Sequence, residues 1–361
     1  MTSATGYAAT AADAPLAPFH FERRALRAGD IAIDILYCGV CHSDLHTARN
    51  EWHNAKYPVL PGHEIVGRVS EVDAAVTRFK AGDMVAVGCL VDSCLECHEC
   101  RAGYEQHCLR GATGTYNSKD RVTGEVTLGG YSDHIVVREE FVLRVPDGLD
   151  PLRAAPLLCA GITTWSPLKR FNVGPGTRVA VAGLGGLGHM GVKLAAALGA
   201  DVTMITTSPE KGEDARRLGA HDVLVSSDRD AMKAARGRFD FILNTIPVAH
   251  DLQPYLGLLA REGAMILVGA IEPLPSVHGG LLMQNDRLVG GSAIGGIPGT
   301  QAMLDFCAEH GVLPDCETIA IQDINEAYER MLRSDVKYRF VIDMASLKAG
   351  GTRPDGAQMI G

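Results

Sequence analysis

Four cysteines crowd into one short stretch of this chain, in the pattern Cys94-x2-Cys97-x2-Cys100-x7-Cys108. Four thiolates so near in sequence can close a tetrahedron around one Zn²⁺ ion on a single loop. Because the protein would fill every ligand position, such an ion would hold the fold together and leave no place for a substrate. Two alternatives stay open: an iron–sulfur cluster, which also takes four thiolates, and four unrelated buried cysteines. The pattern favours a structural zinc lobe over about residues 89–110.

The length and charge of the chain narrow its class. A chain of 361 residues exceeds what one hydrophobic core usually fills, so we expect two domains. A net charge of −9 gives no reason to expect nucleic acid or an acidic membrane face as a partner. No apolar run approaches the roughly 20 residues of a membrane helix, and residues 1–18 lack the pattern of a secretory signal. We therefore expect a cytoplasmic protein, whose ten cysteines are thiols or metal ligands rather than disulfides.

The pattern of apolar residues changes near Pro151. Before it, short strand-like runs are separated by Gly, Pro and Asp turns, which predicts a β-rich domain. After it, strand-like runs alternate with helix-length segments, which predicts a parallel sheet covered by helices. The helices expected in this second part are Gly188–Leu198, Glu210–Leu218, Asp251–Ala260, Thr300–His310 and Ile324–Arg333. The polar, Gly-rich stretch Ala349–Gly361 is expected to be a mobile tail.

A glycine-rich turn indicates a dinucleotide site. Gly183-Leu184-Gly185-Gly186-Leu187-Gly188 matches G-x-G-x-x-G, follows the apolar strand Arg178–Ala182 and precedes a helical run. The glycines permit a tight turn and a close approach of a pyrophosphate to the start of a helix. An ordinary strand–turn–helix glycine loop is the alternative.

The end of the second strand of that domain bears on which dinucleotide binds. An NAD site places an acidic residue there to hold the adenosine ribose, but positions 206 to 208 carry none. The hydroxyls of Thr206, Thr207 and Ser208 and the cation of Lys211 could instead bind a 2′-phosphate, which predicts NADP(H). Glu210 is expected to point outward. A polar helix cap with a surface lysine is the alternative.

Three segments, taken together, resemble one known family. They read Cys41-His42-Ser43-Asp44-Leu45-His46, Gly62-His63-Glu64 and Leu158-Cys159-Ala160-Gly161. The chain resembles the zinc-containing medium-chain dehydrogenases over roughly Ala32–Asp343, and within them the cinnamyl-alcohol-dehydrogenase-like branch with its bacterial NADP-dependent aldehyde reductases. The resemblance implies an α/β fold: a GroES-like β-barrel catalytic domain of residues 1–157 and 298–361, and a Rossmann domain with a doubly wound parallel sheet over 158–297.

The resemblance also implies a second, catalytic zinc ion. Its ligands would be Cys41, His63 and Cys159, with the fourth position open to water, Glu64 or substrate oxygen. Asp44 would accept a hydrogen bond from the second ring nitrogen of His63. Ser43 would be the first proton donor, and the path would continue through the nicotinamide-ribose hydroxyl to His46. His42 would lie near the pyrophosphate.

Further contacts are implied in the same way. Those to the dinucleotide are expected from Thr163, Thr245, Gly269, Ser292, Ala293, Ile294 and Arg339. The substrate pocket is expected between the domains, with walls from Trp52, Cys89, Trp165 and Ile294. The family usually has Gly or Ala where this chain has Asp73, which we interpret as a residue that tolerates a left-handed turn.

The expected activity is hydride transfer between NADP(H) and a small aliphatic or aromatic alcohol or aldehyde, with two zinc ions per chain. The strand-like run Arg287–Ile294 could pair across a two-fold axis, so we expect a homodimer. Alternatives are a zinc-free quinone or enone reductase on the same scaffold, a non-catalytic zinc- and NADP-binding sensor, and a polyol or thiol-linked formaldehyde dehydrogenase.

Overall fold

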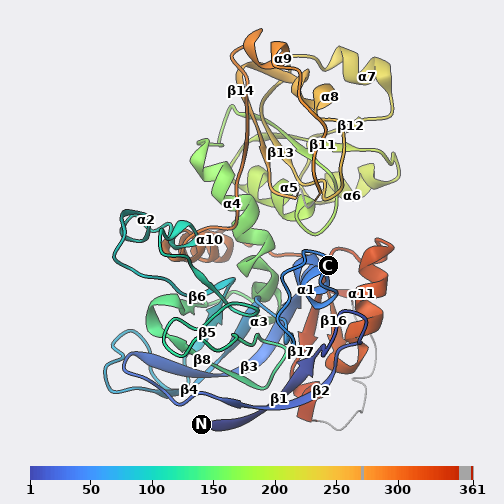
Figure 1. Cartoon of the computed structure of the whole chain (residues 1–361). Helices are drawn as coiled ribbons and strands as arrows, with labels where there is room; N and C mark the ends of the chain where they lie inside the picture. Colours follow the sequence, from blue (N-terminus) through green and yellow to red (C-terminus); the bar gives the residue numbers. More distant parts are fainter. Residues whose placement is uncertain (270–271, 349–358, 361) are drawn as a thin grey trace. The chain divides into compact units, whose positions relative to one another are not determined.

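The computed structural model describes residues 1–269, 272–348 and 359–360, and the chain divides into two compact units (Figure 1). Unit 1 combines Met1–Cys159 with Gly295–Gly361, and unit 2 is Ala160–Ile294. The expected tail falls almost wholly outside the described residues. No helix among those residues is long and apolar enough to cross a membrane.

Unit 1 is built on an eight-stranded sheet with the strand order β18-β16-β17-β3-β4-β5-β9, in which β8 also pairs with β3. Two small sheets, β1-β2 and β6-β7, belong to the same unit. The strands are β1 (Thr2–Ala8), β2 (Ala17–Arg23), β3 (Asp30–Val40), β4 (Ile65–Val72), β5 (Met84–Val87), β6 (Leu90–Asp92), β7 (Thr113–Gly114), β8 (His134–Arg138), β9 (Leu143–Arg144), β16 (Cys316–Ala320), β17 (Arg339–Asp343) and β18 (Met359–Ile360).

The helices of unit 1 are mostly short and occupy the connections between its strands. The α-helices are α1 (His42–Ala48), α2 (His98–Arg101), α3 (Pro151–Ala154), α10 (Ile297–His310), α11 (Ile324–Leu332) and α12 (Ala345–Lys348). The 3-10 turns are η1 (Glu105–His107), η2 (Glu139–Phe141), η3 (Ala155–Leu158) and η4 (Ile321–Asp323).

Strand β3 brings two segments of interest to one edge of the sheet. Its Ile31 and Ile33 are fully buried, and β-branched side chains of this kind suit a packed, pleated surface. Near its end, Cys38 pairs with Ile65, the first residue of the antiparallel strand β4. The residues directly after β3 and directly before β4 therefore lie at the same edge of the sheet, and both segments belong to the predicted catalytic zinc site.

Unit 2 is a parallel six-stranded sheet with the order β12-β11-β10-β13-β14-β15. Counted along the chain this order is 3-2-1-4-5-6, which is the Rossmann arrangement. Figure 1 shows its helices arranged around the sheet. The strands are β10 (Arg178–Ala182), β11 (Asp201–Thr206), β12 (Asp222–Val225), β13 (Phe239–Asn244), β14 (Leu259–Leu267) and β15 (Leu288–Gly291). The helices are α4 (Ala160–Arg170), α5 (Gly188–Ala197), α6 (Lys211–Arg217), α7 (Arg229–Ala234), α8 (Gln253–Leu256) and α9 (Gly280–Met283).

The helix predicted at Asp251–Ala260 is wrong in its second half. Only α8 forms there, and β14 begins at Leu259. Leu259 pairs with Phe239 of β13 and is fully buried beside it. A short apolar run at this position suits a helix or a buried strand equally well, and the tertiary pairing decides between them.

The interpretation of Asp73 as a left-handed turn residue is also wrong. Asp73 is not among the residues with positive φ. Its carboxylate instead accepts hydrogen bonds from the backbone N–H groups of Gly29 and Ala75, both at 3.0 Å. These N–H donors lower the pKa of Asp73, so the side chain closes the turn as a hydrogen-bond acceptor.

Candidate functional site

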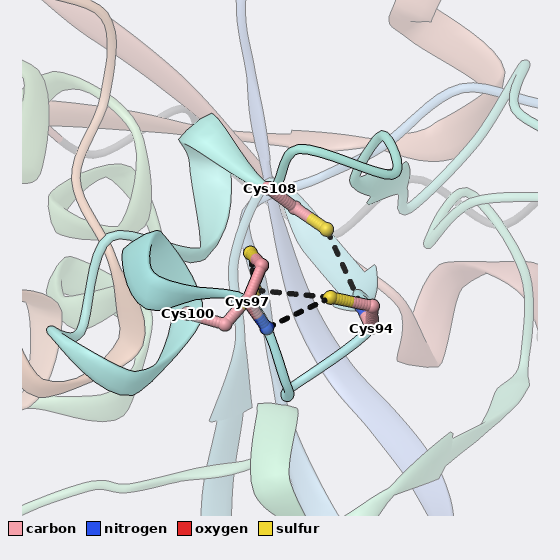
Figure 2. Close-up of side chains that lie close together, drawn as sticks. All are labelled: Cys94, Cys97, Cys100 and Cys108. Atoms are coloured by element: carbon pink, nitrogen blue, oxygen red, sulfur yellow. Dashed lines mark hydrogen bonds between the residues drawn. The ribbon is translucent and has the colours of Figure 1, made fainter.

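The four clustered cysteines surround one point. Figure 2 shows their side chains gathered on one loop, and their sulfur atoms all lie within 4.8 Å of one another. Backbone N–H groups donate to two of the sulfurs: Cys94 N to Cys108 Sγ and Cys97 N to Cys94 Sγ, each at 3.4 Å. The backbone N–H groups of Cys100 and Leu109 lower the pKa of Cys97 to about 6, whereas burial raises that of Cys100 to about 12. Because burial disfavours the thiolate of Cys100, a cation is needed to keep all four cysteines deprotonated. Zn²⁺ fits this donor set.

A second set of metal donors lies at the edge of the large sheet. The donor atoms of Cys41, His63, Glu64 and Cys159 all lie within 4.8 Å of one another. Cys41 precedes α1, His63 and Glu64 precede β4, and Cys159 follows η3. The sulfurs of Cys41 and Cys159 are 3.8 Å apart. The structure thus brings together three segments that are far apart in sequence, within unit 1 alone.

Asp44 orients the imidazole of this set. Its Oδ1 is 3.0 Å from Nδ1 of His63, which is the hydrogen bond expected from the sequence. Both side chains are buried. Burial lowers the pKa of His63, but the Asp44 carboxylate outweighs it and raises that pKa well above its usual value. Because Nδ1 is occupied, Nε2 is the nitrogen left for a metal.

The two carboxylate oxygens of Glu64 have different surroundings. Its Oε1 accepts from Nη2 of Arg339, while its Oε2 is buried and has no hydrogen-bond partner among the residues that the structure describes. Burial raises the pKa of Glu64 well above its usual value, and Arg339 opposes that rise. A Cβ on Gly39 would lie 1.9 Å from this Oε2, so glycine is needed there. A buried carboxylate oxygen without a donor costs free energy, and a metal ion beside it would remove that cost. This observation fits Zn²⁺ in the second donor set.

The predicted proton donors lie on one short helix. Ser43 and His46 both belong to α1, three residues apart and so on neighbouring positions of its surface. The Oγ of Ser43 donates to Cys41 Sγ at 3.1 Å. Nδ1 of His46 contacts Oε2 of Glu51, a residue that sequence reasoning missed. Glu51 lies beyond the end of α1, so no helical spacing could have linked it to His46.

The glycines of the turn in unit 2 are needed for two different reasons: two of them for the fold, and one for the approach of a ligand. Gly183 has φ +94°, and a Cβ on Gly188 would lie 1.8 Å from the carbonyl oxygen of Gly183, so the chain itself requires glycine at both positions. A Cβ on Gly185 would meet nothing within 4 Å. The chain gives no internal reason for glycine there, whereas a pyrophosphate approaching the backbone would. This open position fits a dinucleotide.

The predicted 2′-phosphate residues differ in how available they are. Thr206 is buried, and its Oγ1 accepts from Ser208 N at 3.2 Å. Thr207 and Lys211 are exposed, and Ser208 is half-buried. Glu210 is exposed, as expected. The hydroxyl of Thr206 therefore supports the turn, and the roles of all four residues in binding a phosphate stay predictions.

The other expected contact residues divide between the two units. Unit 2 carries Thr163, Leu184, Gly186, Leu187, Thr245, Gly269, Ser292, Ala293, Ile294 and Trp165, and unit 1 carries His42, Arg339, Trp52 and Cys89. Thr245 Oγ1 lies 2.9 Å from the carbonyl oxygens of both Ala182 and Gly183, so it braces the glycine turn. The ring of Trp52 is 5.5 Å from that of His46. The roles of these residues stay predictions.

The chain matches two family models, described as the alcohol dehydrogenase GroES-like domain over residues 27–147 and the zinc-binding dehydrogenase over residues 186–309. It is 54% identical to NADP-dependent alcohol dehydrogenase C 1 of Mycolicibacterium smegmatis, over 97% of this chain and 100% of the relative. It is 54% identical to aldehyde reductase YahK of Escherichia coli, over 94% and 97%. A solved cinnamyl alcohol dehydrogenase from Sorghum bicolor is 45% identical, with a TM-score of 0.92, over 98% of this chain and 100% of that one.

The fold and the two donor sets define a zinc-type medium-chain dehydrogenase, with a GroES-like unit and a Rossmann unit in one chain. The chain belongs to the zinc-binding alcohol dehydrogenase family.

Proposed function

We propose that this protein is a zinc-dependent alcohol dehydrogenase and aldehyde reductase that transfers hydride between NADP(H) and a small alcohol or aldehyde. The observation that carries the proposal is the second donor set: two thiols, one imidazole whose Nε2 lies 4.0 Å from Glu64 Oε1, and a buried carboxylate oxygen that has no hydrogen-bond partner in the described part of the chain. Three protein ligands with an exchangeable fourth position are typical of catalytic zinc. The relatives named as NADP-dependent alcohol dehydrogenase and aldehyde reductase support the same activity.

Cys41, His63 and Cys159 would hold the catalytic zinc, and the carboxylate of Glu64 would be close enough to occupy the fourth position. When bound, zinc supplies Lewis-acid polarisation of the substrate oxygen, and the nicotinamide supplies or accepts the hydride. Arg339 keeps Glu64 in place through their buried ion pair. The same pairing offsets the cost of burying the carboxylate beside the thiols.

Two residues of α1, Ser43 and His46, are proposed to transfer the proton of the substrate oxygen. Ser43 carries a hydroxyl proton whose acceptor in the structure is Cys41 Sγ, so it is the nearest exchangeable proton to the donor set among the relay residues. The imidazole of His46 is the proposed next carrier of the proton after the nicotinamide-ribose hydroxyl. Glu51 holds Nδ1 of His46 and so fixes which ring nitrogen is left for the relay.

The substrate class is proposed from unit 1 and from the named relatives. Trp52 and Cys89 of unit 1 are proposed to contact the substrate, and the ring of Trp52 lies 5.5 Å from that of His46. A tryptophan favours apolar substituents over sugars, so we propose small aliphatic and aromatic aldehydes. Oxidation of NADPH and of NADH with a panel of such aldehydes, benzaldehyde included, tests the activity and the cofactor together. Two zinc atoms per chain without turnover of any aldehyde would favour a non-catalytic sensor instead.

We also propose that the protein is a homodimer in the cytoplasm. The strand β15 lies at an edge of the six-stranded sheet, and its Leu288 is 46% exposed. An exposed strand edge with an apolar side chain pairs readily with a second copy across a two-fold axis. The cysteines are all free thiols, which suits a reducing compartment.

A further inference from the structure

Behind the second donor set, one buried carboxylate gathers donors from three segments of the chain. Asp44 is fully buried. Its Oδ1 accepts from His63 Nδ1 at 3.0 Å and from Gly62 N at 3.1 Å. Its Oδ2 accepts from Cys41 N at 2.9 Å and from the hydroxyl of Tyr131 at 3.3 Å. Three of these donors belong to a proposed zinc ligand or to the residue next to one. Tyr131 alone comes from elsewhere.

The ring of Tyr131 has little freedom to leave this position. Tyr131 is fully buried, and its backbone N–H donates to the carbonyl of Pro61 at 3.0 Å. A Cβ on Gly62 would lie 2.7 Å from Cδ1 of Tyr131, so the ring packs directly on the glycine that precedes His63. The segment that carries Tyr131 is thus fastened to the His63 segment by its backbone, its ring and, through Asp44, its hydroxyl.

We propose that Tyr131 is a positioning residue for the catalytic metal: its hydroxyl fixes the Asp44 carboxylate, which fixes His63 and the backbone of Cys41. The proposal rests on the proposed zinc function of that donor set. Partners behind metal ligands orient them, and their loss weakens metal affinity. Tyr131 is one hydrogen bond further from the metal than Asp44 is. The distance of 3.3 Å between its hydroxyl and Oδ2 of Asp44 is also long for a hydroxyl donor. We therefore expect a loss of about fivefold in zinc affinity, or ~1 kcal/mol.

Tyr131→Phe tests this proposal because it removes one oxygen atom and keeps the packed ring. Zinc affinity is measured for both sites of the full chain by competition with a chelator. The expected result is a loss of about fivefold at the site of Cys41, His63 and Cys159, with no loss at the four-cysteine site. The visible spectrum of Co²⁺ at the catalytic site should shift as the ligand geometry relaxes, which a merely structural role would not cause.

Tyr255→Phe is the control for the loss of a tyrosine hydroxyl. Tyr255 belongs to unit 2, whereas both donor sets belong to unit 1, so this variant should leave both affinities unchanged. A fivefold loss at the catalytic site with Tyr255→Phe would mean that the loss does not depend on the hydrogen bond to Asp44, and would overturn the assignment to Tyr131.

Three further results would also overturn the proposal. One is an unchanged catalytic-site affinity in Tyr131→Phe, and another is an equal loss at both sites, which would mean general destabilisation. The third uses Asp44→Ala, where both acceptor oxygens are gone: Tyr131→Phe should add nothing in that background, so a second fivefold loss would contradict the pathway. If the wild-type chain binds only one zinc ion, the proposed catalytic site itself fails, a result distinct from these three.

Discussion

The glycine turn of unit 2 offers a matched pair of substitutions with opposite expected effects. In Gly188→Ala the new methyl group would lie 1.8 Å from the carbonyl oxygen of Gly183, which is backbone and cannot swing aside. Ordinary contact needs more than 3 Å, so α5 must move away from β10 by over 1 Å. Overpacking of this kind costs about 1–3 kcal/mol. Such a loss lowers the melting temperature of a unit of this size by roughly 2–12 °C.

In Gly185→Ala the methyl group would meet nothing within 4 Å. Gly185 is not among the glycines with positive φ, so alanine is compatible with its backbone and the folded chain should keep or slightly gain stability. A bound pyrophosphate would meet that methyl group. We expect the NADPH affinity to fall at least tenfold, or about 1.4 kcal/mol.

Melting temperature by circular dichroism and NADPH binding by fluorescence titration check the pair. Each variant is the control for the other, because both add one methyl group to the same turn. The reasoning is refuted if Gly185→Ala binds NADPH as tightly as the wild type, or if Gly188→Ala melts at the wild-type temperature.

The remaining predictions concern the relay, an ion pair and the dimer. Ser43→Ala should lower kcat at least about 100-fold while zinc content stays unchanged; near-normal turnover would remove Ser43 from the relay. Burial raises the pKa of Asp120, but Arg27 and nearby N–H donors hold it at about 2, so Asp120→Asn should cost up to about 2 kcal/mol at pH 7. Because this folded-state pKa is below the unfolded one, that difference should vanish as the pH falls from about 4 to 2, as followed by urea unfolding. Light scattering should give the mass of a dimer for the wild type and of a monomer for Leu288→Asp. A Leu288→Asp variant with the same mass as the wild type would argue against pairing through β15.

The sequence predicted those features that depend on local pattern. The bounds of β10 match the expected run Arg178–Ala182, because it is a short apolar segment that ends at a glycine turn. The four-cysteine loop and the glycine turn were visible for the same reason. The convergence of Cys41, His63 and Cys159 was expected only from resemblance to a family, since no spacing rule links them.

Features that depend on tertiary contact were missed. Glu51 reaches His46 from beyond the end of α1, and Tyr131 reaches Asp44 from a segment far along the chain. Asp73 was assigned a backbone role and has a side-chain one. In each case the hydrogen-bond partner is set by the folded structure, and the local sequence pattern does not predict it.

The central claim is that Cys41, His63 and Cys159 hold one zinc ion separate from that of the four cysteines. Elemental analysis of the purified wild type and of Cys159→Ala tests it most directly. The account predicts two zinc atoms per wild-type chain and one in the variant, which keeps its fold and loses aldehyde reduction. Two zinc atoms in Cys159→Ala, or one in the wild type, would contradict it.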